Sequence, residues 1–170
     1  MRRTSPIRLL SALILLPLAY VGYTACSKSM AKDSFTRPYD LDVSLFSPME
    51  KGPGKPAFGF IKFRQNPDTA RIIDLDTYVT GLAPRHTYLL QRAVNPITDS
   101  SCTSTAWLTL GLGLTPQAIH TDTKGEGHED LWRAVTSIAR GTQFRIHFQI
   151  IDSATQTPVL VSDCDWYEVR

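Results

Sequence analysis

Two histidines and four carboxylates fall within eleven residues of the chain, at His120, Asp122, Glu126, His128, Glu129 and Asp130. Imidazole and carboxylate groups are ligands for divalent cations. Their spacing matches no established ligand motif, and Lys124 adds a positive charge among them. Residues 122–125 also have the composition of a tight hairpin turn, where charged side chains face water. We therefore expect an exposed turn and no cofactor, and we keep as an alternative a metal site that uses His120, Asp122, His128 and Glu129.

Other side chains with chemical potential have simpler interpretations. The sequence holds no G-x-S-x-G nucleophile elbow and no phosphate-binding P-loop. His147 alternates with apolar residues and is expected to face water. Trp107 lies in an irregular stretch that contains glycines, and it is the best candidate among the aromatic residues to line a ligand groove. These observations predict a protein that is not an enzyme.

The first 25 residues have the pattern of an export signal. Arginines at positions 2, 3 and 8 precede residues 9–25, which carry no charge. A basic start followed by a short apolar run is typical of a secretory signal peptide. The run is at the lower limit of length for a membrane-spanning helix, so an uncleaved anchor is the alternative.

The end of this run, Tyr23-Thr24-Ala25-Cys26, resembles the lipobox of bacterial lipoproteins. The resemblance implies cleavage before Cys26 and lipidation of that residue. It also implies a place in the bacterial cell envelope, at the outer membrane because Ser27 follows the cysteine. The membrane would then be a partner, since each buried methylene of an acyl chain contributes about 0.8 kcal/mol. Tyr23 stands where an aliphatic residue is usual, and the alternative is a secreted protein with an incidental cysteine.

Composition and charge narrow the class of protein. The 170 residues are 42% hydrophobic and 20% charged, which is typical of a globular domain. Removing residues 1–25 removes three arginines and no acid, and leaves 15 basic and 16 acidic residues. Because such a chain offers no strongly basic surface, no nucleic-acid partner is expected. We expect a polar tether at residues 26–38 and one domain at residues 39–170.

Cys102 and Cys164 remain once Cys26 is assigned to lipid. In an exported, oxidising compartment two such thiols most simply form a disulfide. It would close a loop of about 63 residues and stabilise the domain by roughly 4 kcal/mol. Free thiols and a metal site are the alternatives, and zinc is disfavoured because neither cysteine has a Cys or His at ligand spacing.

Apolar residues alternate with polar ones over short segments of the remaining chain, which is typical of half-buried β-strands. We expect a bulge in residues 58–63 and one helical turn at residues 136–141, but no long helix. The fold class is therefore predicted as all-β, a single antiparallel β-sandwich of about eight strands. Four aspartates are expected on its solvated side, namely Asp40, Asp42, Asp74 and Asp76. The expected strands are residues 41–45, 58–63, 73–79, 88–95, 131–135, 144–150, 159–161 and 166–169.

The order of these features resembles the copper/zinc superoxide dismutase family, whose fold is an eight-stranded Greek-key sandwich. The matching stretches are residues 59–63, 79–82 with 86–91, 102–104 and 141–147. The resemblance implies Greek-key connections and, again, a bond between Cys102 and Cys164. Chordin-repeat domains are a rival match through a GL-P-x-x-x-Y pattern at residues 81–88, and an immunoglobulin-like topology stays open.

The metal ligands of that family are missing from this sequence. Leu89 and Gln91 stand at two copper-ligand positions, and Leu108 stands at the position that bridges the metals. Only His147 matches a ligand, and one imidazole cannot hold copper in a four-nitrogen site. The resemblance therefore implies a metal-free relative without dismutase activity, since a fold does not carry function by itself.

The sequence thus predicts an exported, lipid-anchored envelope protein that acts as a non-catalytic binding or structural module. Its partner would be an envelope protein or a small-molecule ligand. The alternative function is metal binding or metal handling through His120, His128 and nearby carboxylates.

Overall fold

The computed structural model describes residues 39–48 and 56–170. The regular elements within these residues are all β-strands, which confirms the predicted all-β class. No helix in the described residues is long and apolar enough to cross a membrane. The predicted signal segment at residues 1–25, the tether at residues 26–38 and the lipidation site Cys26 lie outside the described residues. The strands are β1 (Asp40–Phe46), β2 (Phe58–Gln65), β3 (Ile72–Thr80), β4 (Thr87–Pro96), β5 (Leu108–Thr109), β6 (Gly111–Leu112), β7 (Thr115–Pro116), β8 (Ala118–His120), β9 (Gly127–Ala134), β10 (Gln143–Asp152), β11 (Pro158–Ser162) and β12 (Asp165–Glu168).

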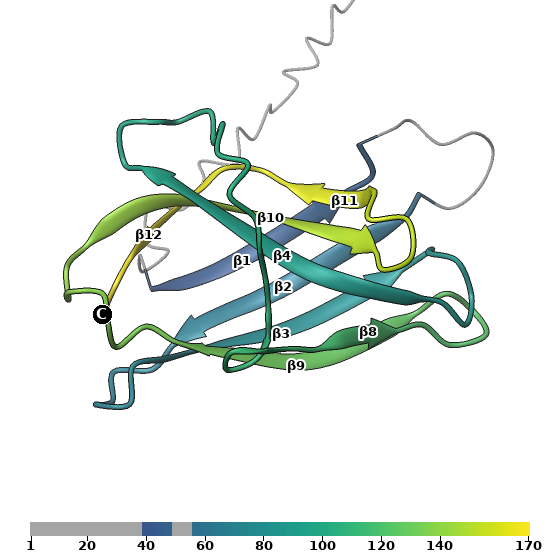
Figure 1. The fold of residues 1–170 in the computed structure, drawn as a ribbon, viewed down its shortest axis with the longest axis horizontal. Helices are drawn as coiled ribbons and strands as arrows, with labels where there is room; N and C mark the ends of the chain where they lie inside the picture. Colours follow the sequence, from purple (N-terminus) through teal and green to yellow (C-terminus); the bar gives the residue numbers. More distant parts are fainter. Residues whose placement is uncertain (1–38, 49–55) are drawn as a thin grey trace, which may run out of the picture. The chain divides into compact units, whose positions relative to one another are not determined.

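The twelve strands of the described residues form one sheet that is almost closed on itself (Figure 1). On one side of β1, the antiparallel neighbours in order are β2, β3 and β9. On its other side they are β11, β10 and β4. The short strand β8 pairs with β4 and lies beside β9, so it brings the two ends of this run together.

This barrel-like sheet differs from the expected sandwich of about eight strands in two layers. Each of the eight expected segments contributes a strand. The additional strands β5 to β8 have only two or three residues each. A period-two pattern cannot be recognised over so few residues, which is why the sequence did not reveal them.

Period-two alternation places one face of each long strand inside the sheet. In β2, for example, Ile61 and Phe63 are buried while Lys62 between them is exposed. Tyr167 of β12 closes the same core, with its ring centroid 4.9 Å from that of Phe63 and 5.0 Å from that of Phe144. Burying a large apolar side chain of this kind contributes about 1.5–3 kcal/mol, so these contacts hold the two sides of the sheet together.

Two local predictions are wrong. β2 pairs in unbroken register with both β1 and β3, so residues 58–63 contain no bulge. The irregularity of the sheet lies instead between Ile150 and Ile151 of β10. Residues 136–141 form hydrogen-bonded turns rather than a helical turn, with the N–H of Ile138 donating to the carbonyl of Val135 at 3.1 Å.

The four aspartates of β1 and β3 do not form one acidic face, because β2 lies between these strands. Lys62 is paired with Asp42 on one side and with Asp76 on the other. Arg64 is paired in the same way with Asp40 and Asp74. It also forms an ion pair with Asp42, with an N–O distance of 2.5 Å. The basic residues of β2 therefore neutralise this face, although an exposed pair contributes at most about 1 kcal/mol.

Cys102 and Cys164 form a disulfide bond with their Cα atoms 5.6 Å apart, which confirms the predicted pairing. The bond joins the loop after β4 to the turn between β11 and β12. Asp99 organises this loop, because its carboxylate accepts hydrogen bonds from the hydroxyl and N–H of Thr103 and from the N–H of Ser101. The hydrogen bonds from Thr103 hold the pKa of Asp99 below its ordinary value.

Candidate functional site

A cavity of about 220 Å³ lies against the inner face of the sheet, and its lining comes from β2, β3, β4, β9, β10 and β12. Most of its lining is apolar, with the aromatic rings of Phe63, Phe144 and Phe148 among the contributors. Two arginines, Arg92 of β4 and Arg133 of β9, share this lining. The cavity is therefore an apolar space with a strongly basic component.

Short segments of chain form the wall where β4 and β9 diverge. β5 pairs with β4 opposite Gln91 and Arg92, and β6 pairs with β9 opposite Trp132. Between them, Leu110 is buried and its N–H donates to the carbonyl of Leu90 at 2.8 Å. The wall over the cavity is thus a thin strap of two-residue strands rather than a long ladder of hydrogen bonds.

Both arginines occupy positions that alternation reserves for the core. Arg92 follows Leu90 and precedes Val94 on the inner face of β4. Arg133 of β9 stands in the same way between Leu131 and Val135, the residue that directly follows the strand. Sequence reasoning missed both residues, and the available signal was an arginine with apolar residues two positions before and after it.

The arginines carry charge that the surrounding protein does not neutralise. Within the described residues neither forms an ion pair with a carboxylate. Nη1 of Arg133 donates to the carbonyl of Gly113 at 3.0 Å. Burial lowers the pKa of Arg92, and the positive charge of Arg133 lowers it further. Because an arginine stays protonated in proteins, two like charges share the lining of an apolar cavity and lie near enough to repel each other.

Of the four residues expected to form a metal site, only His128 belongs to a group of neighbouring ligand atoms in the described residues. His120, Asp122 and Glu129 have other surroundings. Nδ1 of His120 lies 3.3 Å from the Thr87 hydroxyl. The carboxylate of Asp122 accepts hydrogen bonds from the backbone of its own turn, at Lys124 and Glu126, which lowers its pKa. Glu129 lies on the other face of β9 from His128, because neighbouring residues of a strand point to opposite sides.

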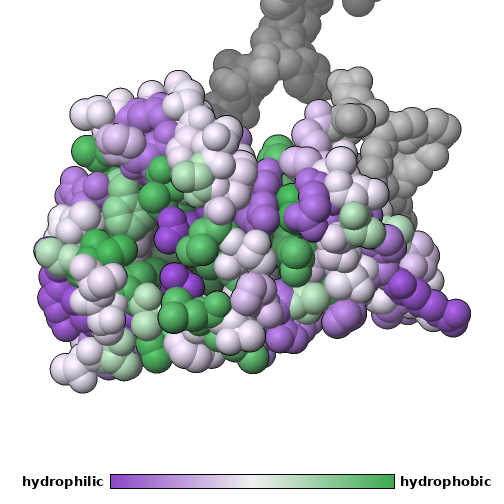
Figure 2. Space-filling view, in the orientation of Figure 1, coloured by the Kyte–Doolittle hydropathy of each residue, from purple (hydrophilic) through white to green (hydrophobic). Residues whose placement is uncertain are grey.

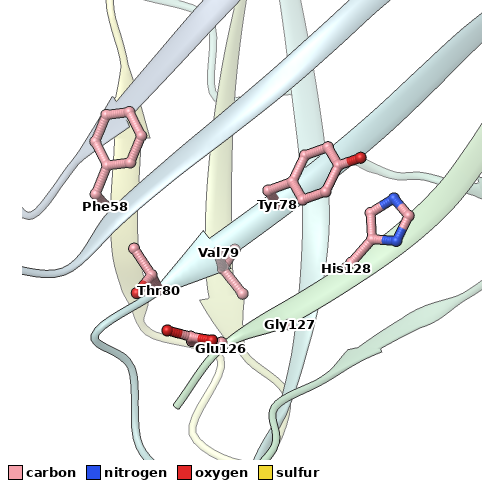
Figure 3. Close-up of a pocket in the computed structure, with 7 residues that line it drawn as sticks. All are labelled: Phe58, Tyr78, Val79, Thr80, Glu126, Gly127 and His128. Atoms are coloured by element: carbon pink, nitrogen blue, oxygen red, sulfur yellow. The ribbon is translucent and has the colours of Figure 1, made fainter. Parts of the chain in front are cut away.

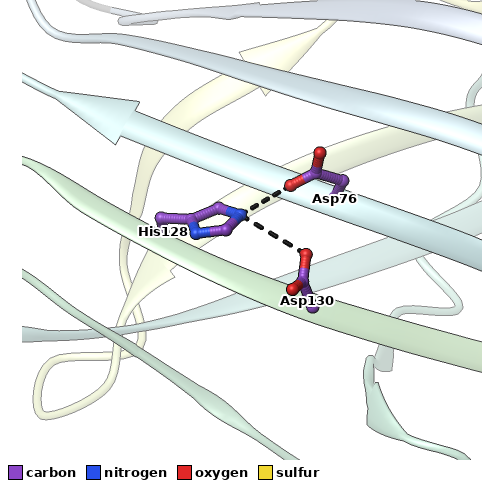
Figure 4. A group of neighbouring side chains, drawn as sticks. All are labelled: Asp76, His128 and Asp130. Carbon is purple, nitrogen blue, oxygen red and sulfur yellow. Dashed lines mark hydrogen bonds and ion pairs between the residues drawn. The ribbon is translucent and has the colours of Figure 1, made fainter.

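His128 instead meets two aspartates (Figure 4). Its Nε2 lies 2.6 Å from Asp76 Oδ1 on β3 and 3.4 Å from Asp130 Oδ1 on β9. One ligand atom from each of the three residues falls within 4.8 Å of the others. The group has the ligand types of a divalent cation site, but His128 and Asp130 are exposed.

A shallow groove runs beside this group on the outer face of the sheet (Figure 3). The ring of Tyr78 stacks on that of His128, with centroids 4.2 Å apart and an interplanar angle of 13°. Phe58, Thr80 and Glu126 complete the rim. The stacking on Tyr78 and the contact with Asp76 together fix the orientation of the His128 imidazole.

His147 is half-buried, so the prediction that it faces water is wrong. Trp107 covers it, with ring centroids 4.6 Å apart, and its Nε2 lies 3.2 Å from the carbonyl of Ser104. Burial lowers the pKa of His147. The loop after β4 thus lies over the outer face of β10, and Trp107 packs there instead of lining a groove.

Copper or zinc does not fit the positions at which the sequence resemblance would place them. Gln91 is engaged in hydrogen bonds with Gln149 at 2.7 Å and with Thr109 at 3.1 Å. Leu89 and Leu108 offer no ligand atom, and His147 is the single imidazole there. Gln91, Gln149 and Thr109 thus satisfy one another through hydrogen bonds.

No family model, curated protein or solved structure matches this chain in comparisons of its sequence and fold. Its function is therefore argued from its own sites. Among these, the cavity with Arg92 and Arg133 combines a concave, mostly apolar lining with unneutralised charge, which are the properties of a small-molecule binding site.

Proposed function

We propose that the protein is an exported, lipid-anchored component of the bacterial cell envelope whose β-domain binds a small-molecule ligand without catalysis. The observation that carries the binding role is the apolar cavity with two inward-facing arginines. Both arginines are half-buried. Charge that is partly withdrawn from water without a carboxylate partner costs stability, so apolar residues at these positions would serve a core better. A ligand that interacts with Arg92 and Arg133 would explain why two charged residues stand at these positions.

Export is supported by three features. The basic start and apolar run of residues 1–25 are typical of a signal peptide, and Cys26 follows them at the position of lipidation. The disulfide between Cys102 and Cys164 belongs to an oxidising compartment. A lipid on Cys26 would hold the domain at the outer membrane, facing the periplasm or the cell surface.

We also propose that the main strands have the Greek-key connections of the superoxide dismutase fold, in a relative that has lost its metals. The sheet order supports this proposal, because the chain leaves β3 and enters β4 on the opposite side of β1. The absence of catalysis is inferred from the replacement of the ligand positions by Leu89, Gln91 and Leu108.

Metabolic labelling tests the anchor. The full chain is expressed in a bacterium with an outer membrane and fed labelled palmitate. We expect label on the wild type and on Cys102→Ser, and none on Cys26→Ser, which should leave the membrane fraction. Label that persists in Cys26→Ser would contradict the proposed anchor.

Mass spectrometry of extracted small molecules tests the binding role. The wild type and a Val94→Phe variant, in which the larger side chain occupies the cavity, are purified in the same way. We expect a small molecule to accompany the wild type and to be depleted in the variant. Equal extracts from the two proteins would argue against a ligand in this cavity.

Metal handling is the second candidate function, and the Asp76–His128–Asp130 group favours it. Elemental analysis of the full chain, purified without chelators, tests this candidate. It predicts about one metal ion per chain, lost in His128→Gln but retained in His120→Gln. A chain that holds no metal after incubation with copper and zinc would remove this candidate.

A further inference from the structure

We propose that the ligand of the cavity is an amphipathic anion, whose head group binds Arg92 and Arg133 and whose single apolar tail or ring occupies the cavity. This inference rests on the proposed binding function and specifies the chemical class of its ligand. The anionic head group is a carboxylate or a phosphate ester, since both present oxygen pairs to a guanidinium fork.

The first argument is the placement of charge. Both arginines stand at inner-face positions of long strands, between residues that belong to the core or pack against it. Two guanidinium groups that repel each other in an apolar space destabilise the empty domain. An anion between them would replace this repulsion with two attractions.

The second argument is the supply of free donors. A guanidinium has five N–H donors, and that of Arg92 has no hydrogen-bond partner within the described residues. In Arg133, Nη1 donates a hydrogen bond to the carbonyl of Gly113. The remaining donors come from opposite strands, β4 and β9, so a single head group could bridge the place where the sheet is held by the thin strap.

The third argument is the apolar part of the site. A cavity of about 220 Å³ exceeds the roughly 150 Å³ that suffices for benzene in an engineered apolar cavity. This space suits one short acyl chain or one ring, and it is too small for the two long chains of a membrane phospholipid. A purely inorganic anion would leave the apolar surface unused.

The outer surface offers an apolar approach to the same place. Figure 2 shows apolar side chains gathered around hydrophilic ones on the left half of this face, where Figure 1 has β10 and β4 above and β9 below. In the hairpin of β6 and β7, Leu114 is 82% exposed and Leu112 is 43% exposed. Apolar surface thus lies outside the strap as well as inside it, as an amphipathic molecule would require on its way in.

Thermal unfolding of the full chain in a nonionic detergent tests this inference. The probes are octanoate, octyl phosphate and 1-octanol, which share a tail and differ in the head group. The variants are Arg92→Met and Arg133→Met, and the matched control is Arg85→Gln, which removes an exposed arginine from the turn before β4. Every variant is measured at the same concentrations of detergent and probe, so partition of the probes into micelles is the same for all of them.

We expect octanoate or octyl phosphate to raise the Tm of the wild type and of Arg85→Gln, with 1-octanol weaker. Each Arg→Met change should raise the apparent Kd for the anion about tenfold or more, as expected when a charge-assisted hydrogen bond is lost. The ligand-free Tm of Arg92→Met should equal or exceed that of the wild type, which shows that the variant folds. The stronger of the two anions identifies the head group.

Equal binding of 1-octanol and octanoate, unaffected by Arg92→Met, would overturn the anionic class and leave a cavity that binds neutral molecules. If no probe changes the Tm of any variant, both this inference and the proposed binding function fall. A ligand-free Arg92→Met that is less stable than the wild type would show that Arg92 serves the fold, and would also count against the proposal.

Discussion

Gly113 holds the β6–β7 hairpin against β9. Its φ of +66° lies in the left-handed region, which side chains rarely adopt. A Cβ at this position would lie 2.7 Å from Cη2 of Trp132, and the Gly113 carbonyl accepts the hydrogen bond of Arg133. The absence of a side chain thus fixes both the hairpin and one of the two cavity arginines.

We predict that Gly113→Ala lowers the free energy of unfolding by about 1–3 kcal/mol, because it combines backbone strain with displacement of the Trp132 ring. Gly141→Ala is the matched control, since Gly141 also has a positive φ, of 77°, but has nothing within 4 Å of a built Cβ. The control should lose only the backbone contribution, about 1 kcal/mol. Urea unfolding measures both, and equal losses would contradict the role given to the ring.

His147 makes the stability depend on pH. Its pKa in the folded domain is lower than the ordinary 6.5, because burial disfavours the charged imidazole. The unfolded chain therefore binds a proton at a higher pH than the folded chain does. Stability is complete above pH 6.5, falls as the pH is lowered from there, and levels off below the folded pKa.

We predict that His147→Gln removes this part of the pH dependence, since an amide can still donate to the Ser104 carbonyl but does not titrate. The measurement is the free energy of unfolding at pH 7.5, 6.5 and 5.5. The wild type should lose stability over this range more steeply than the variant. Parallel profiles would show that His147 does not carry the effect.

At the scale of elements, the long loop after β4 is held at three places. The disulfide ties it to the turn before β12, Asp99 closes its first turn, and Trp107 covers His147 on β10. Without these contacts the outer face of β4 and β10 would be open to water. The loop is thus part of the packing of the domain rather than a mobile connection.

We predict that the double variant Cys102→Ser/Cys164→Ser loses roughly 4 kcal/mol, because the bond closes a loop between residues 62 positions apart. Urea unfolding with and without a thiol reductant measures the loss. The reduced wild type is the control and should match the double variant. A loss below about 1 kcal/mol would mean that the unfolded chain gains little freedom from reduction.

The sequence predicted strands best where alternation was long and regular. β10 was found because Phe144, Ile146, Phe148 and Ile150 alternate with polar residues. β5 to β8 were not found, because two or three residues carry no period. Alternation placed His147 on the outer face of β10, but a sequence pattern does not say that a distant loop will cover that face.

The candidate site was beyond the same reasoning for a related reason. An arginine between apolar residues can snorkel to the surface or remain inside, and the sequence alone does not separate these outcomes. What makes Arg92 notable is that Arg133, on a strand about forty residues later, meets it without any carboxylate. The sequence pointed instead to the cluster of acidic residues near His128. Of that cluster, only Asp130 lies beside the histidine.

At the scale of the whole domain, the wall of the sheet is uneven in strength. β4 and β10 are paired over nine residues. β1 and β2 are paired over seven residues, and β3 is paired over eight residues with each of β2 and β9. Between β4 and β9 the wall depends on β5, β6 and β8, each paired over one to three residues. β1 and β11 also pair over only two residues. Local opening should therefore concentrate in the strap and at the junction of β1 with β11.

We predict that backbone amides of residues 108–120 exchange with deuterium before those of residues 58–80 and 143–152. Hydrogen exchange followed by mass spectrometry of peptides tests this order. An anion that bridges Arg92 and Arg133 should slow exchange of the strap more than that of the other strands. Uniform exchange across the domain would indicate a wall of even stability.

The position of β1 in the sheet has a consequence for how the protein is made. Its two neighbours are β2, which follows directly, and β11, which begins at residue 158. Gln65 at the end of β2 likewise waits for Tyr167, whose hydroxyl donates to its Oε1 at 2.6 Å. In the export that we propose for this chain, β1 to β3 would emerge first, with an edge of β1 that only residues from 158 onward can cover. Folding would then wait until the last strands have crossed, so the rate of translocation, rather than of strand pairing, would set the moment of folding.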